Sequence, residues 1–284
     1  MAEIKTLDQL LDALRHGYTV SDGRVILPPQ RQAARKEDKA ERHFCVSLAG
    51  RVVAIDSFYN QVYSLCSDYL CDLPPEIRIS ITEKDLMYER EESKKSGFFS
   101  RNDYLETLAV YRKICEEMLF FNTFLMHGAV VASGNSAYMF TAESGTGKTT
   151  HIKKWLNCLE NAYVVNGDKP LIRMTETEAV ACGTPWCGKE QMGTNTMVPL
   201  KAIVIMERGE NNEMAKLTYR EAFPFILQQT YQPAGTEQKK KTLHLLSQLK
   251  GKVHFYRFVF NNMKEDAFDV AYQTLTEGKC ETNH

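Results

Sequence analysis

The chain has 284 residues, of which 43% are hydrophobic and 25% are charged. These values are ordinary for a folded protein and exclude a wholly disordered chain, a collagen-like fibre and a small disulfide scaffold. The formal net charge of −1 supplies no global basic field, so we expect neither a nucleic-acid partner nor a membrane partner.

The length fits one large domain or two modest ones, and the sequence changes character between its two parts. Residues 1–122 are predicted to form a β-rich region of unknown role. Apolar residues at helical spacing predict a short helix over 7–16. Segments rich in β-branched or aromatic residues then predict strands at Arg24–Leu27, Phe44–Leu48, Arg51–Ile55 and Arg78–Thr82.

Polar stretches and a long helix complete this first region. The stretches 30–42 and 89–100 are rich in charged residues and predict loops. An apolar stripe after them predicts a helix that is capped by Asn102 or Asp103.

Residues 123–284 alternate between strand and helix patterns and are predicted to form an α/β nucleotide-binding core. The predicted strands are Met126–Val131, Tyr138–Thr141, Ala162–Val165, Leu171–Met174, Ala179–Cys182, Ala202–Met206 and Val253–Phe260. The predicted helices are Thr149–Cys158, Tyr219–Thr230, Thr236–Leu249 and Lys264–Thr274. No internal repeat is present, which argues against a solenoid or a propeller.

The strongest chemical signal is the segment from Phe140 to Thr150, which follows a predicted strand and opens a predicted helix. This is the context that a phosphate-binding loop requires. Glycines let backbone amides approach phosphate oxygens, the lysine adds positive charge, and the next hydroxyl is a ligand for Mg²⁺. We therefore expect ATP and Mg²⁺ as cofactors. The predicted phosphate-binding residues are Ser144, Gly145, Thr146, Gly147, Lys148, Thr149 and Thr150.

The segment departs from the phosphate-loop pattern GxxxxGK[ST] at one position, where Ala142 replaces the first glycine. Alanine has the smallest side chain with a Cβ, so the loop tolerates it if this position does not need a positive φ. The alternative is a helix-opening turn, rich in small residues, that holds no ligand.

A second signal is the apolar segment Tyr163–Val165, which ends in Asn-Gly-Asp. In phosphate-loop enzymes an aspartate at such a strand end meets the Mg²⁺ held by the loop hydroxyl. We expect Thr149 and Asp168 to hold the metal, because the intervening helix returns the chain to a neighbouring strand. Taken alone, Asn-Gly-Asp is more often only a turn.

Two weaker signals concern His127 and the segment Gly183–Glu190, whose Gly, Pro and Trp residues suggest an ordered loop. Lys189 is predicted to bind the substrate or neutralise a phosphate, and Trp186 to stack on or wall off the site. A surface turn with a buried tryptophan is the alternative. His127 is predicted to act in proton transfer, with a satisfied core histidine in an apolar strand as the alternative.

Three of these segments together resemble a known family. His127-Gly128-Ala129, then Ser144–Thr149, then Asn166-Gly167-Asp168, in this order, resemble the carboxy-terminal catalytic domain of HPr kinase/phosphorylase. They also resemble the wider superfamily that includes ATP-dependent phosphoenolpyruvate carboxykinase. The segment Gly183–Glu190, followed by Val198–Val204, looks more like the uncharacterised HPr-kinase-like proteins than like the classical enzyme. The resemblance covers about Leu125 to Thr274 and implies a carboxykinase-type phosphate-loop core.

The sequence departs from this family at Gly167. There the resemblance implies the first of two consecutive acids, one of which serves as the base. Only Asp168 remains, so the base and the reverse phosphorolysis are in question, and Asp168 or His127 would have to replace it. An aspartate introduced at position 167 is expected to raise turnover if the backbone there accepts a side chain.

These observations predict an ATP- and Mg²⁺-dependent kinase that acts on a hydroxyl of a protein, peptide or small molecule. Lys148, Asp168 and His127 are the predicted catalytic residues. A nucleotide-binding regulatory protein without turnover is the alternative that Gly167 keeps open, and a carboxykinase-like enzyme is a second one. The sequence leaves the acceptor open, and also whether the chain forms a homo-oligomer.

The cysteines and the amino terminus bear on the compartment. None of the eight cysteines forms a CxxC pair, so no zinc ribbon or redox motif is indicated. The first residues, Met1-Ala2-Glu3-Ile4-Lys5, show no apolar signal core, and no run of apolar residues is long enough to span a membrane. We therefore expect a cytoplasmic protein with reduced thiols.

Overall fold

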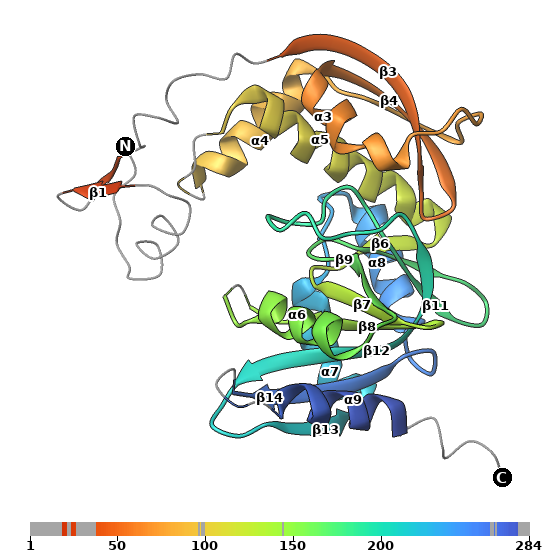
Figure 1. The fold of residues 1–284 in the computed structure, drawn as a ribbon. Helices are drawn as coiled ribbons and strands as arrows, with labels where there is room; N and C mark the ends of the chain where they lie inside the picture. Colours follow the sequence, from red (N-terminus) through yellow and green to blue (C-terminus); the bar gives the residue numbers. More distant parts are fainter. Residues whose placement is uncertain are drawn as a thin grey trace. The chain divides into compact units, whose positions relative to one another are not determined.

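The computed structural model of the chain describes residues 19–21, 24–26, 38–95, 97, 100–143, 145–261, 264 and 266–277 (Figure 1). Its structure is mixed α/β, as the sequence predicts. The helix predicted over 7–16 lies outside the described residues, and so does Ser144.

The chain divides into two compact units whose segments interleave in the sequence. The first unit includes Ile55–Ser64 and Ile79–Val110. The second includes Cys45–Ala54, Leu65–Arg78 and the chain from Tyr111 onward. The boundary predicted between residues 122 and 123 stays a prediction.

Residues 1–122 contain helices as well as strands, so the predicted β-rich character is not confirmed. The strands are β1 (Thr19–Ser21), β2 (Arg24–Ile26), β3 (Lys39–Leu48), β4 (Arg51–Tyr59) and β5 (Ile77–Ser80). The helices are α3 (Asn60–Leu65), α4 (Glu83–Lys95) and α5 (Asn102–Met118), with 3₁₀ turns at Ser67–Tyr69 and Leu119–Phe121. Strands β3, β4 and β5 form one sheet in that order.

Two predicted loops of this region are wrong in part, because helix α4 runs into the stretch 89–100 and β3 begins inside 30–42. Thr82 and Asp85 fix the start of α4, since each side chain bonds the backbone N–H of the other. Two lysines near its end pair with glutamates three residues earlier. Only Leu86 and Glu89 are buried, so α4 lacks the apolar stripe by which a helix is recognised in a sequence.

A buried carboxylate holds part of the first unit. Glu106 of α5 is fully buried, and its two oxygens accept hydrogen bonds from the backbone N–H groups of Phe58 (2.5 Å) and Tyr59 (3.0 Å). Burial raises the pKa of Glu106 to about 6, although both hydrogen bonds act against the rise. The end of β4 is thus tied to α5 by a charge-assisted contact.

The second unit is built on a large sheet. Its strands are β6 (Thr123–Leu125), β7 (Ala129–Ser133), β8 (Ser136–Thr141), β9 (Ala162–Asn166), β10 (Leu171–Met174), β11 (Ala179–Cys182), β12 (Met197–Arg208), β13 (Glu213–Leu217) and β14 (His254–Phe260). The long strand β12 joins two parts. Its first residues pair with β11, which leads to β10 and β6, and its later residues pair with β8 and β14.

The strand directions place three connecting segments at one edge of this sheet: those before β7, after β8 and after β9. Strand β7 runs antiparallel to both β8 and β9. Strands β8 and β9 are therefore parallel to each other, and their carboxyl ends lie at the same edge as the amino end of β7. Strand β12 is parallel to β8, so it also ends there. We expected the strand that leads to Asp168 to lie directly beside the phosphate-loop strand, and this is wrong. Strand β7 lies between β8, which leads to the loop, and β9, which leads to Asp168.

Helices cover both faces of the sheet (Figure 1). They are α6 (Lys148–Cys158), α7 (Tyr219–Gln229), α8 (Thr236–Ser247) and α9 (Ala267–Glu277). Because successive strand residues face opposite sides, two cores form. Val130 and Met139 pack with residues of α7 and α8, whereas Val131 and Phe140 pack with residues of α6 and α9.

Most elements predicted for residues 123–284 are present. Strands β10 and β11 have the predicted bounds, and the four helices begin or end within a few residues of their predicted positions. Strands β6 and β13 were not predicted. The strand predicted over Met126–Val131 is wrong at its start, because β7 begins at Ala129 and His127 lies in the link between β6 and β7.

The cysteines and the helices of the structure bear on the predicted compartment. All seven cysteines of the described residues are free, and Cys280 lies outside them. Among the helices that the structure describes, none has the length and apolar character needed to cross a bilayer. The cytoplasmic location stays a prediction.

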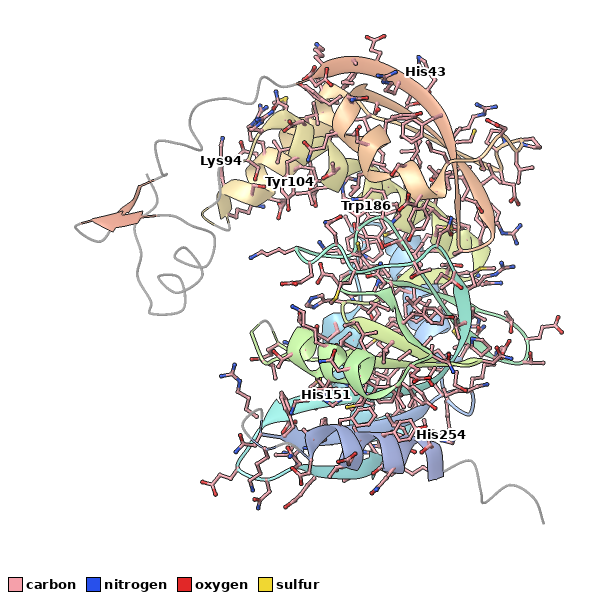
Figure 2. All side chains as sticks on the ribbon, viewed as in Figure 1. His43, Lys94, Tyr104, His151, Trp186 and His254 are labelled. Atoms are coloured by element: carbon pink, nitrogen blue, oxygen red, sulfur yellow. The ribbon has the colours of Figure 1, made fainter. Side chains whose placement is uncertain are left out.

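His151 is a buried polar residue on α6 (Figure 2). It is 1% exposed, its Nε2 accepts a hydrogen bond from Trp155 Nε1 at 3.0 Å, and its ring centroid lies 4.7 Å from that of Phe140. Its Nδ1 is buried without a hydrogen-bond partner among the described residues. Burial, aided by the charge of Lys154, lowers the pKa of His151 from 6.5 to about 3.

This burial predicts a loss of stability in mild acid. Between pH 6.5 and about 3 the unfolded chain binds a proton at this position and the folded chain does not, so the stability that His151 contributes is lost as the pH falls. From pH 7 to pH 5 we expect the wild type to lose about 2 kcal/mol more of its unfolding free energy than His151→Gln. Glutamine still offers Trp155 an acceptor but does not titrate. Urea unfolding at both pH values measures the difference, and parallel losses would contradict a buried neutral His151.

Candidate functional site: the phosphate loop and the Asp168 turn

The phosphate loop connects the carboxyl end of β8 to the amino end of α6. Gly145 (φ 79°) and Gly147 (φ 119°) lie in the left-handed region that favours glycine. Ala142 has no positive φ, so the condition under which alanine can replace the first glycine is met. Ser144 falls in the part of the loop that is not described.

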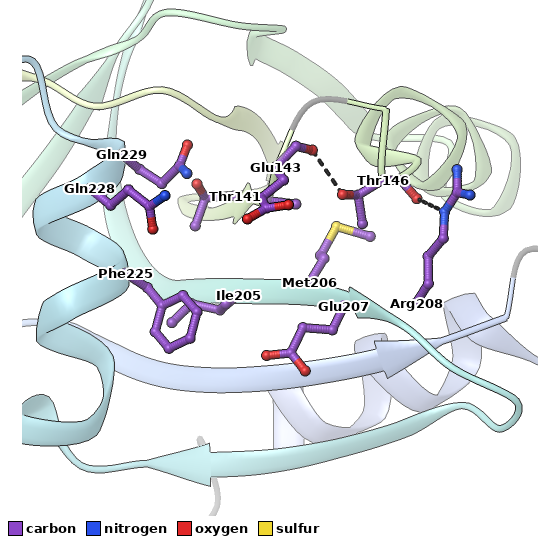
Figure 3. Close-up of a pocket in the computed structure, with 11 residues that line it drawn as sticks. Thr141, Glu143, Thr146, Ile205, Met206, Glu207, Arg208, Phe225, Gln228 and Gln229 are labelled. Carbon is purple, nitrogen blue, oxygen red and sulfur yellow. Dashed lines mark hydrogen bonds between the residues drawn. The ribbon is translucent and has the colours of Figure 1, made fainter. Parts of the chain in front are cut away.

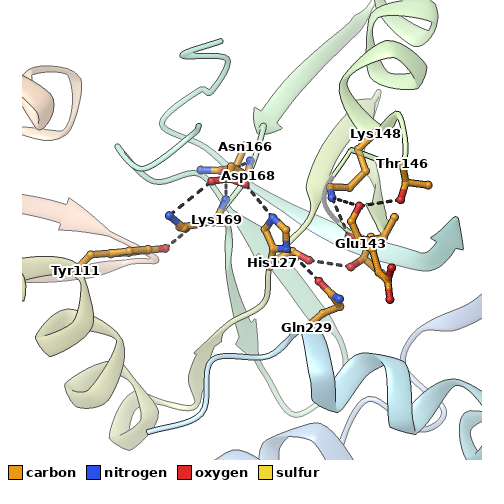
Figure 4. Close-up of polar contacts among 11 residues, drawn as sticks. Tyr111, His127, Glu143, Thr146, Lys148, Asn166, Asp168, Lys169 and Gln229 are labelled. Atoms are coloured by element: carbon orange, nitrogen blue, oxygen red, sulfur yellow. Dashed lines mark hydrogen bonds and ion pairs between the residues drawn. The ribbon is translucent and has the colours of Figure 1, made fainter. Parts of the chain in front are cut away.

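Lys148 lies over this loop (Figure 4). Its Nζ donates to the carbonyl oxygens of Ala142 (2.9 Å) and Glu143 (3.5 Å). Burial lowers the pKa of Lys148, and the charge of Asp168 acts in the opposite direction. The ammonium group is therefore held beside the first turn of α6, where the helix dipole also favours an anion.

Arg208 binds the same loop from β12. Its Nη2 donates to the carbonyl oxygen of Gly145 (2.5 Å) and its Nε to that of Thr146 (3.2 Å; Figure 3). The sequence analysis missed this residue. The available signal was a cation two residues after the predicted strand end at Met206, because parallel strands end at a common edge.

A cavity of about 410 Å³ lies beside the loop (Figure 3). Its lining comes from the end of β8 and the loop, from the end of β12, and from α7. The lining residues are Thr141, Ala142, Glu143, Thr146, Ile205, Met206, Glu207, Arg208, Phe225, Gln228 and Gln229. The volume lies in the range of small-molecule sites.

His127 and Asp168 are in direct contact at the edge of the sheet (Figure 4). His127 Nε2 lies 3.0 Å from Asp168 Oδ1, and His127 Nδ1 lies 3.0 Å from Gln229 Oε1. Burial raises the pKa of Asp168, but the hydrogen bond with His127 and the charges of Lys169, His127 and Lys148 outweigh it, so the pKa is lowered. Asp168 is thus ionised at neutral pH, and His127 is held between two polar side chains.

Asn166 shapes the turn that carries Asp168. Its fully buried side chain accepts hydrogen bonds at Oδ1 from the backbone N–H groups of Asp168 (2.8 Å) and Lys169 (2.7 Å). Its Nδ2 donates to Thr184, and the hydroxyl of Tyr111 donates to the carbonyl oxygen of Lys169 at 2.5 Å. The Asn-Gly-Asp segment is therefore a turn whose backbone is held by hydrogen bonds with Asn166 and Tyr111.

Gly167 has no room for a side chain. A Cβ there would lie 2.9 Å from the carbonyl oxygen of Cys187 and 3.1 Å from that of Met192. Both obstacles are backbone atoms. Gly167→Asp was expected to raise turnover only if the backbone there accepts a side chain, and this condition is not met. No base can be restored at this position without moving the backbone.

The loop Gly183–Glu190 packs beside the Asp168 turn. Trp186 is 7% exposed and its ring stacks on Tyr111, with centroids 4.2 Å apart. It is a wall of the turn and offers no free face for a ligand ring. Lys189 is exposed, and Glu190 beside it pairs with Lys153 of α6. No hydrogen bond or ion pair joins Lys189 to the other predicted site residues that the structure describes.

Thr149 and Asp168 are the residues that could hold Mg²⁺. Both offer the hard oxygen atoms that this ion prefers. The lowered pKa of Asp168 keeps it charged, and among the described residues its Oδ2 has a single long ion pair, of 3.7 Å, with Lys169 Nζ. In the described part of the chain no three His, Cys, Asp or Glu residues could hold a metal together. The residues fit an ion whose coordination is completed by phosphate and water, and the Thr149–Asp168 pairing stays a prediction.

Comparison with known proteins adds little. No protein-family model and no curated protein matches the chain. Among solved structures it is similar to the Hpr(Ser) kinase/phosphatase from Coxiella burnetii, with 9% sequence identity and a TM-score of 0.35, over 55% of this chain and 98% of that one.

Gly188 offers a test of the geometry around Asp168. Its φ is +83°, and a Cβ there would lie 2.9 Å from Asp168 Cβ. Gly134 also has a positive φ (+55°) but has open space around it. We expect Gly188→Ala and Gly134→Ala to lose similar stability, about 1–2 kcal/mol, from the left-handed backbone.

Only Gly188→Ala should displace the Asp168 carboxylate and weaken Mg²⁺-dependent ATP binding. Urea unfolding and calorimetry with Mg–ATP measure the two effects. Equal nucleotide affinity in both variants would show that the position of Asp168 does not matter for binding.

Proposed function

We propose that this protein is a Mg²⁺-dependent phosphotransferase that moves the γ-phosphoryl group of ATP to a hydroxyl. The carrying observation is that the phosphate loop and the His127–Asp168 pair lie at one edge of the sheet. Lys148 and Asp168 are near enough for each to shift the pKa of the other. A phosphate-binding element and an acid–base pair therefore face the same region.

In this proposal the loop and α6 bind the phosphates. The backbone around Gly145 and Gly147, together with Lys148, stabilises the negative charge that spreads over the γ-phosphoryl oxygens during transfer. Thr149 and Asp168 would hold Mg²⁺, which would neutralise part of the phosphate charge during transfer. Thr150 and Ser144 belong to the same proposed phosphate-binding set.

His127 is the proposed base for the acceptor hydroxyl. Asp168 orients its ring through Nε2, so the acceptor hydroxyl would have to replace Gln229 at Nδ1, and that nitrogen would then take the proton. The closed space at Gly167 leaves no room for an acid at position 167. A positioned base contributes about 10²–10⁴ to the rate, so the missing acid does not rule out transfer.

The cavity beside the loop is the proposed acceptor site. Gln229 both lines this cavity and contacts His127, so a hydroxyl bound there would lie on the side of the base. Phe225, which is 44% exposed, supplies an apolar wall. A role for Lys189 in substrate binding remains a proposal that no contact supports.

A regulatory protein that binds ATP without turnover is the second candidate, and the closed space at Gly167 favours it. The two candidates differ in one measurement. Release of ADP from Mg–ATP, with water or a screened hydroxyl compound as acceptor, supports the enzyme. Tight ATP binding with no ADP released supports the regulator.

The phosphate loop is tested by Lys148→Ala with Lys153→Ala as its control. Both remove one lysine from α6, but Lys153 is exposed and pairs with Glu190. Because a hydrogen bond to a charged group is worth about 1.5–3 kcal/mol, we expect ATP affinity to fall about tenfold or more in Lys148→Ala and to stay near the wild-type value in Lys153→Ala. Calorimetry measures both, and equal affinities would remove the phosphate-loop assignment.

The base is tested by the pH dependence of ADP formation. A base has to be unprotonated to act, and the lowered pKa of Asp168 keeps that carboxylate ionised in mild acid, so a decline of the rate there is expected only if another group is the base. We expect His127→Ala to lose about 10²–10⁴ in rate together with this decline, while binding ATP normally. Asp168→Asn should lose the response to Mg²⁺ as well. An unchanged pH profile in His127→Ala would contradict the proposed base.

A further inference from the structure

A second cavity, of about 570 Å³, lies within the second unit and shares no lining residue with the cavity beside the phosphate loop. Its walls come from the start of β4, the segment after α5, the end of β10 and the segment after α8. The lining residues are Arg51, Phe120, Phe121, Asn122, Arg173, Met174, Thr175, Glu176, Gln248 and Lys252. Nothing in the proposed phosphotransfer uses these residues.

Three cations from separate segments line this cavity, against one carboxylate, Glu176. Arg173 donates from Nη1 to the carbonyl oxygen of Ala49 at 3.1 Å, and Lys252 donates from Nζ to that of Thr175 at 2.5 Å. A guanidinium has five N–H groups and an ammonium has three. The hydrogen bond of each side chain to a backbone carbonyl oxygen holds it in place, and each has further N–H groups that a ligand could use.

Arg51 adds an unsatisfied donor. Its Nη1 pairs with Glu76 at 2.6 Å, and its guanidinium lies over the ring of Phe121, 4.9 Å from the centroid. Its Nε is buried and has no hydrogen-bond partner in the part of the chain that the structure describes. Buried donors are seldom left unpaired, so the described residues do not fully satisfy the guanidinium of Arg51.

The charges point to an anion. Arg51, through its hydrogen bond and its charge, lowers the pKa of Glu76, and Arg173 adds to this, so two carboxylates, Glu76 and Glu176, stand against three cations. Lys252 brings a third positive charge to the same cavity. Like charges that converge in a partly buried space repel one another unless an anion joins them. Guanidinium forks match the paired oxygens of a phosphate group.

We infer that this cavity binds a small organic phosphate. The phosphate group would lie among Arg51, Arg173 and Lys252. The cavity is larger than inorganic phosphate needs, and Phe120, which is 46% exposed, gives an apolar wall for the organic part of the ligand. This site is independent of the phosphate loop and of the proposed phosphotransfer.

The test uses the full chain with Lys148→Ala, which is expected to weaken binding at the phosphate loop, and phenyl phosphate as the probe. Calorimetry should detect binding in this background. Adding Lys252→Gln should weaken it about tenfold, the effect of losing about 1.4 kcal/mol, whereas adding Lys250→Gln, an exposed lysine outside the cavity, should not. Absence of binding in the background, or equal affinity in the two variants, would overturn the inference.

A second pair of variants leaves the three cations in place. Phe120 and Leu243 are exposed to the same degree, 46% and 47%, but only Phe120 lines the cavity. Phe120→Glu should weaken phenyl phosphate binding through repulsion and the loss of the apolar wall, and Leu243→Glu should leave it unchanged. Inorganic phosphate should bind more weakly than phenyl phosphate. Equal binding of the two probes, or equal effects of the two glutamates, would contradict an organic phosphate site.

Discussion

Strand β7 runs antiparallel between β8 and β9, and this pairing decides where the polar groups of the second unit lie. The register sets Ala129 opposite Phe140 and Val130 opposite Asn166. The chain therefore enters β7 and leaves both neighbours at one edge, while the alternate apolar residues fill the cores on the two faces. The sheet positions three links, which lie before β7, after β8 and after β9. Together these links bring the predicted site residues to one edge.

Asp168 shows how a charge is kept in such a place. The side chain of Asn166 closes the turn and so holds the backbone that carries the carboxylate. Its charge is balanced by groups from three directions: His127 before β7, Lys148 after β8 and Lys169 in the same turn. An ionised acid beside the predicted phosphate loop is the electrostatic arrangement that the proposed binding of a metal–nucleotide complex requires.

The sequence could predict what is local along the chain. The phosphate loop, with its strand, glycines and helix, lies within a dozen or so residues, and β10 and β11 are apolar runs bounded by turns. It could not predict α4, which is largely polar, or β13, a short strand with no fully buried residue. Arg208 and Gln229 reach the site only through the packing of distant segments. The closed space at Gly167 arises because the carbonyl groups of Cys187 and Met192 return from a later loop.

The chain has two tryptophans, and they occupy different surroundings. Trp155 lies in the aromatic core under α6, bonded to His151. Trp186 stacks on Tyr111, whose hydroxyl binds the turn that carries Asp168. The protein therefore contains two intrinsic fluorophores, one fixed in a dry interior and one coupled to the polar turn. A movement of that turn would change the emission of Trp186 and leave that of Trp155 as an internal reference.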